Sequence, residues 1–467
     1  MTWPITQSSR VAPGPSGGWT FGVLRSFQRD ALGFLTEATA TYGDVVRLQF
    51  GPITAHLVNH PSHVEQVLVR CSPEFDKRTR SVSKIRATCG DSLLSSEGRL
   101  WQKHRRIMQP LFRDKELARY IGTIEDAIEQ MLRGWRVTAG QGEPVDMIHA
   151  MMGLTLNIAT RVFFDCDIDR HTETIEHALK DILTDTWRRV ESPVDLASMF
   201  PMLHRKAFRR AIADLDAIVY EIISERRHRP RDAGDLLSRL LDANQATSDQ
   251  QLSDRELRDA VLTLLLAGHE TTANALTWAF CCISQSLAAE KRICDSVSMQ
   301  SVGCDHQDDS VVTSAFYETL RLYPSIWIME RRALSHTTIG DYRIPRGSMV
   351  LISPYVLHRH PQFWHKPDEF LPDRFVDGSG HVEPDLGIQT RYAYLPFGAG
   401  PHRCIGEPLA KYVGVRVLTR VYREFRLRLL AAHTIRPIPG ITLRHGDHVR
   451  FQLQRRAEHE GAGCDRS

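Results

Sequence analysis

The feature that most constrains the fold is the spacing of apolar residues through the middle of the chain, which recur at positions i, i+3 and i+4. This period places them on one face of an α-helix, so we expect a chain built mainly from amphipathic helices. The longest helix begins after Ser253, which can cap it together with Glu256 in a capping box, and extends to about Gln285. The other expected helices cover residues 26–42, 61–69, 99–112, 117–135, 147–164, 207–229, 313–322 and 407–424.

Short strands account for the remaining regular structure. Residues 45–50 alternate like a strand, and residues 55–58 follow a Gly-Pro turn as its hairpin partner. Residues 325–353 and the segment after residue 424 also favour short strands. A length of 467 residues alone suggests two or three domains, but no internal repeat or low-complexity segment is found. We therefore expect one mainly α domain with minor β over residues 19–455, with a loose lead-in at 1–18 and a tail at 456–467.

The charge balance argues against nucleic-acid binding by the whole protein. The chain has 59 basic and 56 acidic residues, a net charge of +3, whereas nucleic-acid binders usually show a strongly basic domain or stripe. The N-terminus has neither a long apolar run nor a signal-peptide layout. The strongest apolar stretch, residues 261–267, is far too short to span a bilayer. We expect a cytoplasmic protein without a membrane anchor, and a monomer.

The nine cysteines do not form a framework. Their number is odd and no repeated Cys-x-x-Cys pairs occur, so neither a disulfide scaffold nor a structural zinc site is indicated. Most are expected to be small buried hydrophobic residues in a reducing compartment. Cys404 differs because of its neighbours.

Residues 397–406 read Phe-Gly-Ala-Gly-Pro-His-Arg-Cys-Ile-Gly, a glycine-rich loop that ends in a cysteine just before a helix. Gly398, Gly400 and Gly406 permit unusual backbone angles and the close approach of a flat partner. Cys404 lies at or near the helix N-terminus, where the dipole and free N–H groups favour a thiolate, and His402 and Arg403 add positive charge. The alternative interpretation is a buried cysteine in a glycine-rich turn.

The long helix carries a second unusual segment, residues 265–272. Gly268 in a helix interior costs about 1 kcal/mol relative to alanine, which invites a packing or functional reason. Glu270 and Thr271 place an acid beside a hydroxyl within an otherwise apolar helix. Without further context, the two would be a structural polar pair.

Two further pairs sit at helical spacing. Glu318 and Arg321 share a helix face, as do Trp101 and Arg105. Exposed ion pairs at this spacing are common and contribute little to stability. Trp101 and Arg105 alone would indicate an ordinary amphipathic surface helix.

Taken together and in this order, these segments resemble the cytochrome P450 family. The cysteine loop matches the family signature at every fixed position, with His402 where most members carry arginine. The resemblance extends from about Pro13 to Leu453. It implies a helix-rich single domain that holds haem b between the long central helix and the helix after the cysteine loop. Cys404 would be the axial thiolate ligand to the iron.

The resemblance also implies roles for the other residues of these motifs. Gly268 would leave a groove for dioxygen, Thr271 would hydrogen-bond oxygen there, and Glu270 would help to relay protons. The haem propionates need cationic or hydrogen-bonding partners, because a buried unpaired carboxylate is costly. The family positions for these partners are Trp101, Arg105, His402 and Arg331, with the neighbouring Arg332 left as an alternative to Arg331.

Glu318, Arg321 and Arg374 match a structural motif of the family that ties a helix to the loop before the cysteine. They are therefore expected to serve folding and haem retention. The stretch between the acid–alcohol helix and Glu318 is short for the family and unusually polar around residues 301–310, which leaves a trimmed or irregular helix pair open there.

By the same resemblance, the chain is expected to be a monooxygenase that inserts one oxygen atom of dioxygen into a C–H or C=C bond. Electrons would come from NAD(P)H through a separate ferredoxin and ferredoxin reductase, because no cysteine cluster or flavin domain is found. A basic docking surface is one interpretation of five helix residues, and a solvated helix face is the other. These residues are Lys103, Arg105, Arg106, Arg113 and Lys115.

The substrate pocket is expected to be lined by residues 75–94, 187–203, 262–267 and 325–329. Residues 326–329 are large and apolar, which favours a lipophilic secondary metabolite such as a terpenoid, a polyketide or a fatty-acid derivative. Three alternatives remain. The haem could serve a peroxygenase, isomerase or ring-coupling reaction, the protein could be a haem sensor or sequestering protein, or Cys404 could be structural in a protein without haem.

Overall fold

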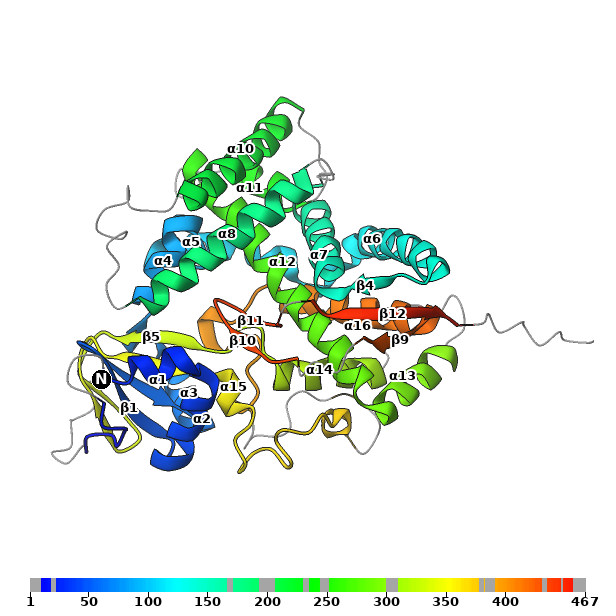
Figure 1. The fold of residues 1–467 in the computed structure, drawn as a ribbon. Helices are drawn as coiled ribbons and strands as arrows, with labels where there is room; N and C mark the ends of the chain where they lie inside the picture. The colour runs from blue at the N-terminus through cyan, green and yellow to red at the C-terminus, as the bar shows by residue number, and fades with distance from the viewer. Residues whose placement is uncertain are drawn as a thin grey trace, which may run out of the picture.

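The computed structural model describes residues 10–17, 22–165, 171–192, 206–229, 235–243, 252–299, 310–377, 382, 391–430, 435–446 and 448–456. Helices dominate, as the sequence predicts, and a five-stranded sheet lies at one end of the molecule (Figure 1). The helices are α1 (Leu24–Arg29), α2 (Ala31–Tyr42), α3 (Pro61–Glu65), α4 (Arg80–Cys89), α5 (Gly98–Met108), α6 (Asp114–Gln141), α7 (Met147–Phe164), α8 (Thr172–Glu191), α10 (Lys206–His228), α11 (Leu236–Ala243), α12 (Asp254–Ser284), α13 (Leu287–Met299), α14 (Ser310–Leu322), α15 (Pro354–Leu357) and α16 (Glu407–Glu424).

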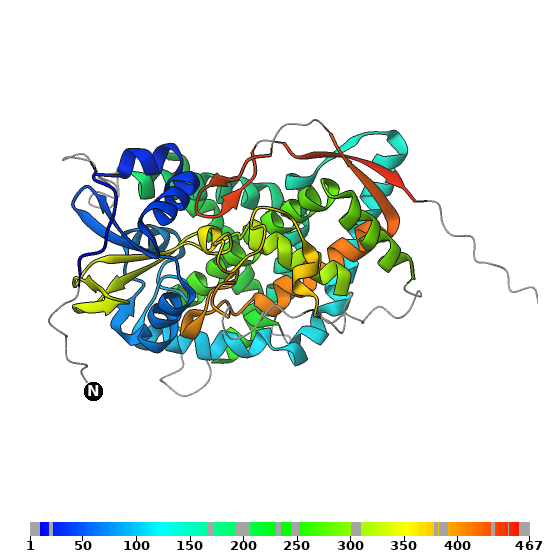
Figure 2. The same cartoon turned by 90° about the horizontal axis from the view of Figure 1, so that it is seen from below.

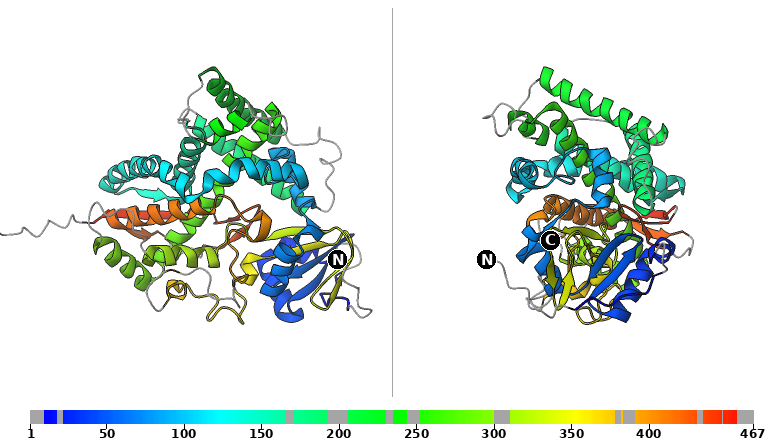
Figure 3. Two further views of the ribbon diagram at one scale, coloured as in Figure 1. Left: turned by 180° about the vertical axis from the view of Figure 1, so that it is seen from behind. Right: turned by 90° about the vertical axis from the view of Figure 1, so that its left-hand side faces the viewer.

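The sheets are small. The largest has the order β1-β2-β8-β5-β3, in which β1 and β2 form the predicted antiparallel hairpin and β8 runs parallel to β2. This sheet and α1 to α3 gather at one end, and α13 lies at the other (Figures 2 and 3). The strands are β1 (Val45–Phe50), β2 (Ile53–Val58), β3 (Phe75–Asp76), β4 (Pro144–Asp146), β5 (Met329–Ala333), β6 (Thr337–Ile339), β7 (Tyr342–Ile344), β8 (Met349–Ile352), β9 (Phe425–Leu429), β10 (Ile438–Pro439), β11 (Leu443–Arg444) and β12 (Arg450–Arg455).

Helix α12 forms the centre of the helical part. Its predicted capping box is present: the Glu256 amide donates to Ser253 Oγ (3.2 Å) and the Ser253 amide donates to Glu256 Oε2 (2.7 Å). Most of its residues are buried, and it packs against α7, α14 and α16. The helix can therefore present side chains to an interior site.

Helix α7 is the one described helix that is long and apolar enough to cross a membrane by length and composition. It is mostly buried and packs closely against α12. Its apolar character is therefore explained by its position in the protein core.

Several expected boundaries are wrong. The helix expected at 26–42 is two helices, because the Asp30 side chain accepts a hydrogen bond from the Gly33 amide and begins α2. Helices α4, α8 and α11 were not expected, whereas α13 lies in the stretch where a helix pair was left open. In α4 only Lys84, Thr88 and Cys89 are buried, so the apolar periodicity is weak. Within 301–310, only Ser310 lies inside the described residues.

Part of the expected N-terminal lead-in lies against the large sheet. The Arg47 amide donates to the Pro13 carbonyl (2.7 Å), and Ala12 is buried. The boundaries at residues 18 and 456 stay predictions, and residues 1–9 and 457–467 lie outside the described residues.

Candidate active site

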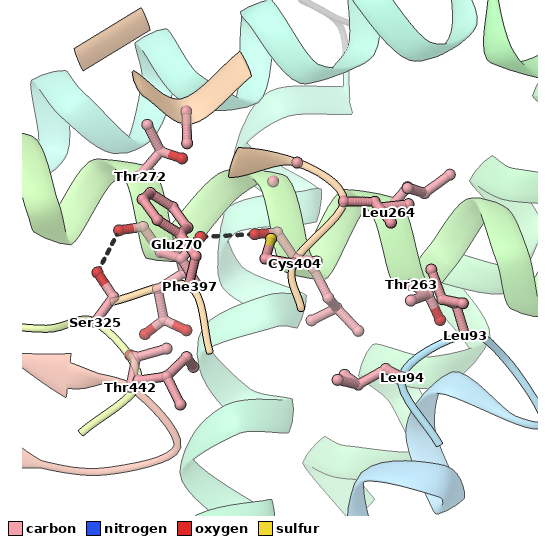
Figure 4. A pocket seen from close by; sticks show the side chains of 18 of the residues that line it. Leu93, Leu94, Thr263, Leu264, Glu270, Thr272, Ser325, Phe397, Cys404 and Thr442 are labelled. Carbon is pink, nitrogen blue, oxygen red and sulfur yellow. Dashed lines mark hydrogen bonds between the residues drawn. The ribbon is translucent and has the colours of Figure 1, made fainter. Parts of the chain in front are cut away.

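Helix α12 and the loop before α16 face each other across a cavity of about 440 Å³ (Figure 4). All eight sequence-predicted site residues line this cavity, although they come from α5, α12, β5 and the cysteine loop. They are Trp101, Arg105, Gly268, Glu270, Thr271, Arg331, His402 and Cys404.

The cysteine loop has unusual backbone angles at two of the three expected glycines, since Gly406 has an ordinary φ of −80°. Gly398 and Gly400 have φ of 71° and 69°, in the left-handed region that other residues rarely adopt. A Cβ atom on Gly400 would lie 1.9 Å from the carbonyl oxygen of Leu68. Only glycine at this position therefore lets the loop lie against the backbone at Leu68. The Cys404 amide donates to the Phe397 carbonyl (3.0 Å), which closes the loop.

The thiol of Cys404 faces the cavity and is exposed there. Burial among protein atoms raises the pKa of this thiol, although the amides of Gly406 and Glu407 donate hydrogen bonds that lower it. The amides at the helix N-terminus therefore favour the thiolate, as expected, but desolvation has the larger effect in the protein alone. A metal ion at the sulfur would reverse this balance, since a coordinating thiol loses its proton.

Gly268 has a packing reason in this structure. A Cβ atom there would lie 3.0 Å from Cε2 of Phe163 on α7, tighter than ordinary van der Waals contact. The absence of a side chain therefore lets α12 and α7 approach closely. The groove for dioxygen stays a prediction.

Glu270 and Thr271 are neighbours in sequence but make separate interactions. Glu270 is almost fully buried, and its Oε1 accepts a hydrogen bond from Arg444 Nε (2.7 Å) of β11. Thr271 Oγ1 donates to the Ala267 carbonyl (2.7 Å), while Ser325 Oγ donates to the Thr271 carbonyl (2.7 Å). Arg444 was missed by the sequence reasoning, because it lies far along the chain in a short strand without a motif.

One wall of the cavity is positively charged. Lys77, Arg105 and Arg331 line it, and burial lowers the pKa of all three, that of Lys77 to about 8. Among the described residues, Glu97 is the carboxylate whose charge acts on both Lys77 and Arg331. With three cations and one carboxylate, the wall keeps an excess of about two positive charges.

His402 completes this wall as a neutral side chain. Burial, together with the positive charges of Lys77, Arg331 and Arg105, lowers the pKa of His402 to about 3. Its ring packs against Trp101, with the ring centres 4.2 Å apart, and its buried Nδ1 has no hydrogen-bond partner in the structure. The wall therefore provides unused hydrogen-bonding capacity as well as charge.

These features fit haem b. A flat apolar group with two carboxylates would place the carboxylates on a wall with about two excess positive charges. The same placement would give the unpaired Nδ1 of His402 a partner. The remaining apolar lining would suit the porphyrin ring, and Cys404, which also lines the cavity, would hold its iron.

A family model described as Cytochrome P450 matches residues 12–445. The chain belongs to the cytochrome P450 family. Its cofactor is therefore haem with a cysteine thiolate ligand, and it is an oxidoreductase that incorporates oxygen from dioxygen. The alternative of a protein without haem is excluded.

Relatives and a solved structure agree with this assignment. Cyclooctatin synthase and cyclooctat-9-en-7-ol 5-monooxygenase of Streptomyces melanosporofaciens are each 32% identical to this P450, over 95% and 94% of its chain and 95% of each relative. Pentalenene oxygenase of Streptomyces avermitilis is 28% identical, over 92% of this chain and 94% of its own. The crystal structure of the cytochrome P450DA haem domain superposes with a TM-score of 0.84 at 26% identity, covering 97% of this chain and 100% of that one.

The alternatives Arg331 and Arg332 are separated by the structure. Arg332 pairs with Asp76 on the neighbouring strand β3, at 2.7 and 3.1 Å, and does not line the cavity. Arg331 lines the cavity and donates to the backbone carbonyl of Glu330 (2.9 Å). Of the two arginines, Arg331 is the one that lines the cavity, and its contact with a propionate stays a prediction. Lys77, which directly follows β3, is a further candidate. The sequence did not indicate it, because a single lysine outside any motif carries no signal.

Replacing Arg331 with glutamine is expected to weaken haem retention in this P450. A hydrogen bond to a charged group contributes about 1.5–3 kcal/mol, so haem should transfer to apomyoglobin roughly 10- to 100-fold faster. Arg332→Gln is the matched control, because its partner is Asp76 on the sheet. Equal rates of haem loss in the two variants would contradict the assignment of Arg331.

Glu318 and Arg321 form a buried structural pair. Both side chains are fully buried, with Arg321 donating to Glu318 through Nε (2.7 Å) and Nη2 (2.8 Å). Arg374 Nε donates to the same carboxylate (3.0 Å). The interpretation as an exposed surface pair is therefore wrong, and the three residues have the arrangement that the resemblance implies.

Arg321 also connects this pair to the cysteine loop. It donates to the carbonyls of His358 (2.8 Å), Pro367 (2.6 Å) and Glu369 (3.0 Å). The His358 ring lies between the Arg321 carbonyl (3.0 Å) and the Leu395 amide, which donates to Nε2 (2.7 Å). Burial lowers the pKa of His358 to about 3, so the ring is neutral and Nδ1 carries the proton. The network holds α14 against the start of the cysteine loop.

Proposed function

We propose that this P450 hydroxylates or epoxidises a terpenoid, with electrons from NAD(P)H delivered through a separate ferredoxin and ferredoxin reductase. In this reaction one atom of dioxygen enters the substrate and the other leaves as water, while NAD(P)H is oxidised. The observation that carries the proposal is the apolar part of the cavity beside Cys404. The names of the relatives that act on cyclooctat-9-en-7-ol and pentalenene support the same substrate class.

The apolar part of the cavity is built by α4, α8, α12 and the segment before β5. Ile326 and Met329 line it as expected, but Trp327 is fully buried elsewhere and donates to the Gly440 carbonyl (2.9 Å). The described lining from α8 is Ile182, Leu183 and Thr186, just before the expected segment, and residues 193–203 lie outside the described residues. A compact hydrocarbon skeleton suits such a lining better than a charged or extended polar ligand.

We propose Cys404 as the axial ligand. When bound, the haem supplies the activation of dioxygen, and the protein supplies position and protons. Thr271 Oγ1 can exchange its bond to the Ala267 carbonyl for a bond into the cavity by rotation about χ1. Glu270 can take up and release a proton at its carboxylate, which Arg444 holds at the edge of the cavity.

Replacing Thr271 with alanine is expected to uncouple electron use from product formation. The variant should bind substrate and consume NAD(P)H, but product formed per NAD(P)H should fall about tenfold or more, with hydrogen peroxide as the balance. Thr277→Ala, on the same helix and bonded to the Ala273 carbonyl, is the control. Unchanged coupling in Thr271→Ala would contradict the proposed role.

A labelled-oxygen experiment tests the reaction class. The protein is incubated with cyclooctat-9-en-7-ol or pentalenene, NAD(P)H, a surrogate ferredoxin with its reductase, and ¹⁸O₂. The proposal predicts a product with one ¹⁸O atom that requires the electron donors. A product without label, or one formed equally well without donors, would favour a peroxygenase or isomerase. Reduction of the haem without turnover of either substrate would contradict the proposed terpenoid substrate class.

The proposed redox-partner surface is smaller than expected. Lys103 is bonded to Glu256 (3.1 Å) and Arg105 belongs to the cavity wall, so neither presents its charge freely to a partner. Arg106, Arg113 and Lys115 are exposed and remain the candidates for docking an acidic ferredoxin. A monomeric state and a cytoplasmic location stay predictions.

A further inference from the structure

Three threonine hydroxyls in the apolar wall of the cavity are buried without conventional hydrogen-bond partners. Thr88 of α4, Thr186 of α8 and Thr263 of α12 all line the cavity and are 3%, 2% and 4% exposed. None of their Oγ1 atoms has an oxygen or nitrogen partner, and each has almost no surface toward the cavity, so a rotation about χ1 would bring it to a ligand. The nearby thiol of Cys89 interacts with Thr263, but a thiol is only a weak partner.

Several other polar groups of the apolar wall are satisfied, whereas the unpaired Nδ1 of His402 belongs to the charged wall. Thr155 donates to the Met151 carbonyl (2.9 Å), Ser325 to the Thr271 carbonyl (2.7 Å), and Thr442 accepts from Asn274 Nδ2 (3.1 Å). Leaving a buried hydroxyl unpaired costs about 1–3 kcal/mol. Three such hydroxyls on three helices therefore indicate a group that arrives from outside the protein.

The position of these threonines relative to the oxidation site is fixed by α12. Thr263 precedes Thr271 by about two helical turns on the same face, so the two side chains are roughly 12 Å apart along the helix axis. Figure 4 shows Thr263 beside Leu93, on the opposite side of Cys404 from Ser325 and Thr442. Helices α4 and α8 pack against one another, and α4 packs against α12. The unpaired hydroxyls thus lie at the end of the cavity away from Ser325.

We propose that Thr88, Thr186 and Thr263 bind an oxygen function, a hydroxyl or a carbonyl, that the terpenoid already carries when it enters. This inference rests on the proposed function and names the substrate more narrowly. The oxygen function would lie about two turns of α12 away from Thr271, the residue proposed to act at the oxidation site. The enzyme then acts second in a sequence. An earlier step must install the first oxygen, by monooxygenation or by capture of water when the hydrocarbon skeleton is formed.

The test compares two probes that differ by one hydroxyl. Cyclooctat-9-en-7-ol and its 7-deoxy hydrocarbon are titrated against the haem-loaded protein by equilibrium dialysis. The wild type is expected to bind the alcohol about tenfold or more tightly than the hydrocarbon. Thr88→Val and Thr186→Val, singly and together, keep the side-chain shape and remove the hydroxyl. They should bring the ratio close to one, with unchanged affinity for the hydrocarbon.

A matched control and a second readout separate recognition from structure. Thr277→Val removes a buried hydroxyl that is bonded within α12, and should leave the ratio at the wild-type value. Because the cavity hydroxyls are unpaired, Thr186→Val should unfold at the same denaturant concentration as the wild type, or a higher one.

Three outcomes would overturn the inference: equal binding of both probes to the wild type, an unchanged ratio in the double variant, or destabilisation by Thr186→Val. None of these three outcomes bears on the class of reaction that the enzyme catalyses. Failure of the proposed function would appear in the labelled-oxygen experiment, as no labelled product from either terpenoid.

Discussion

Replacing Arg321 with alanine is expected to lower the free energy of unfolding by about 3–5 kcal/mol, which is a large share of the stability of a typical protein. The substitution leaves the carboxylate of Glu318 buried with Arg374 as its remaining cation. It also removes the donors to three backbone carbonyls near the cysteine loop, among them those of His358 and Pro367. We expect the Arg321→Ala variant to give little soluble protein and to unfold at a much lower denaturant concentration than the wild type.

The control for this substitution is an ion pair at the same spacing but on the surface. Lys366 and Glu369 are 3.1 Å apart and about half exposed, so Lys366→Ala should change stability by less than about 1 kcal/mol. Denaturant titrations followed by circular dichroism measure both variants. If Arg321→Ala unfolds with the same midpoint as Lys366→Ala, the buried network does not hold the fold together. Arg374→Gln provides a milder variant if Arg321→Ala cannot be purified.

Replacing Cys404 with serine is expected to reduce terpenoid oxidation to the level of an enzyme-free control. Serine has nearly the same shape, and the amides of Gly406 and Glu407 can still donate to its oxygen, so the fold should survive. A serine hydroxyl does not give iron the electron density that a thiolate gives, and dioxygen activation depends on that density.

The matched control is Cys71→Ser, a half-buried cysteine that does not line the cavity. It should keep wild-type product formation. Both variants are compared by product yield and by circular dichroism. Loss of activity in both, or retained activity in Cys404→Ser, would contradict the role of Cys404.

The sequence predicted best what depends on neighbouring residues. The capping box of α12, the bounds of α7 and α16, and the left-handed glycines of the cysteine loop follow from local backbone requirements and appear in the structure. Helix α4 was missed because it buries few residues and leaves little periodicity in the sequence, whereas α8 buries residues at helical spacing that the sequence analysis overlooked.

Properties that depend on packing between distant segments could not be predicted in the same way. Successive residues of a strand point to opposite faces, so Arg331 and Arg332 had to differ, but which one faces the cavity depends on the sheet. The spacing of Glu318 and Arg321 is the same for an exposed and a buried pair. Lys77 and Arg444 reach the site only through the tertiary fold. The pKa of Cys404 depends on how closely distant segments surround its sulfur, and this effect outweighs the amides of the helix N-terminus.

The most direct test of the central claim is the difference spectrum of the reduced protein with carbon monoxide, measured for the wild type and Cys404→Ser. We expect the red-shifted band of a thiolate-ligated haem in the wild type and its absence in the variant. The same red-shifted band in Cys404→Ser, or a folded wild type that takes up haem without showing it, would contradict Cys404 as the ligand.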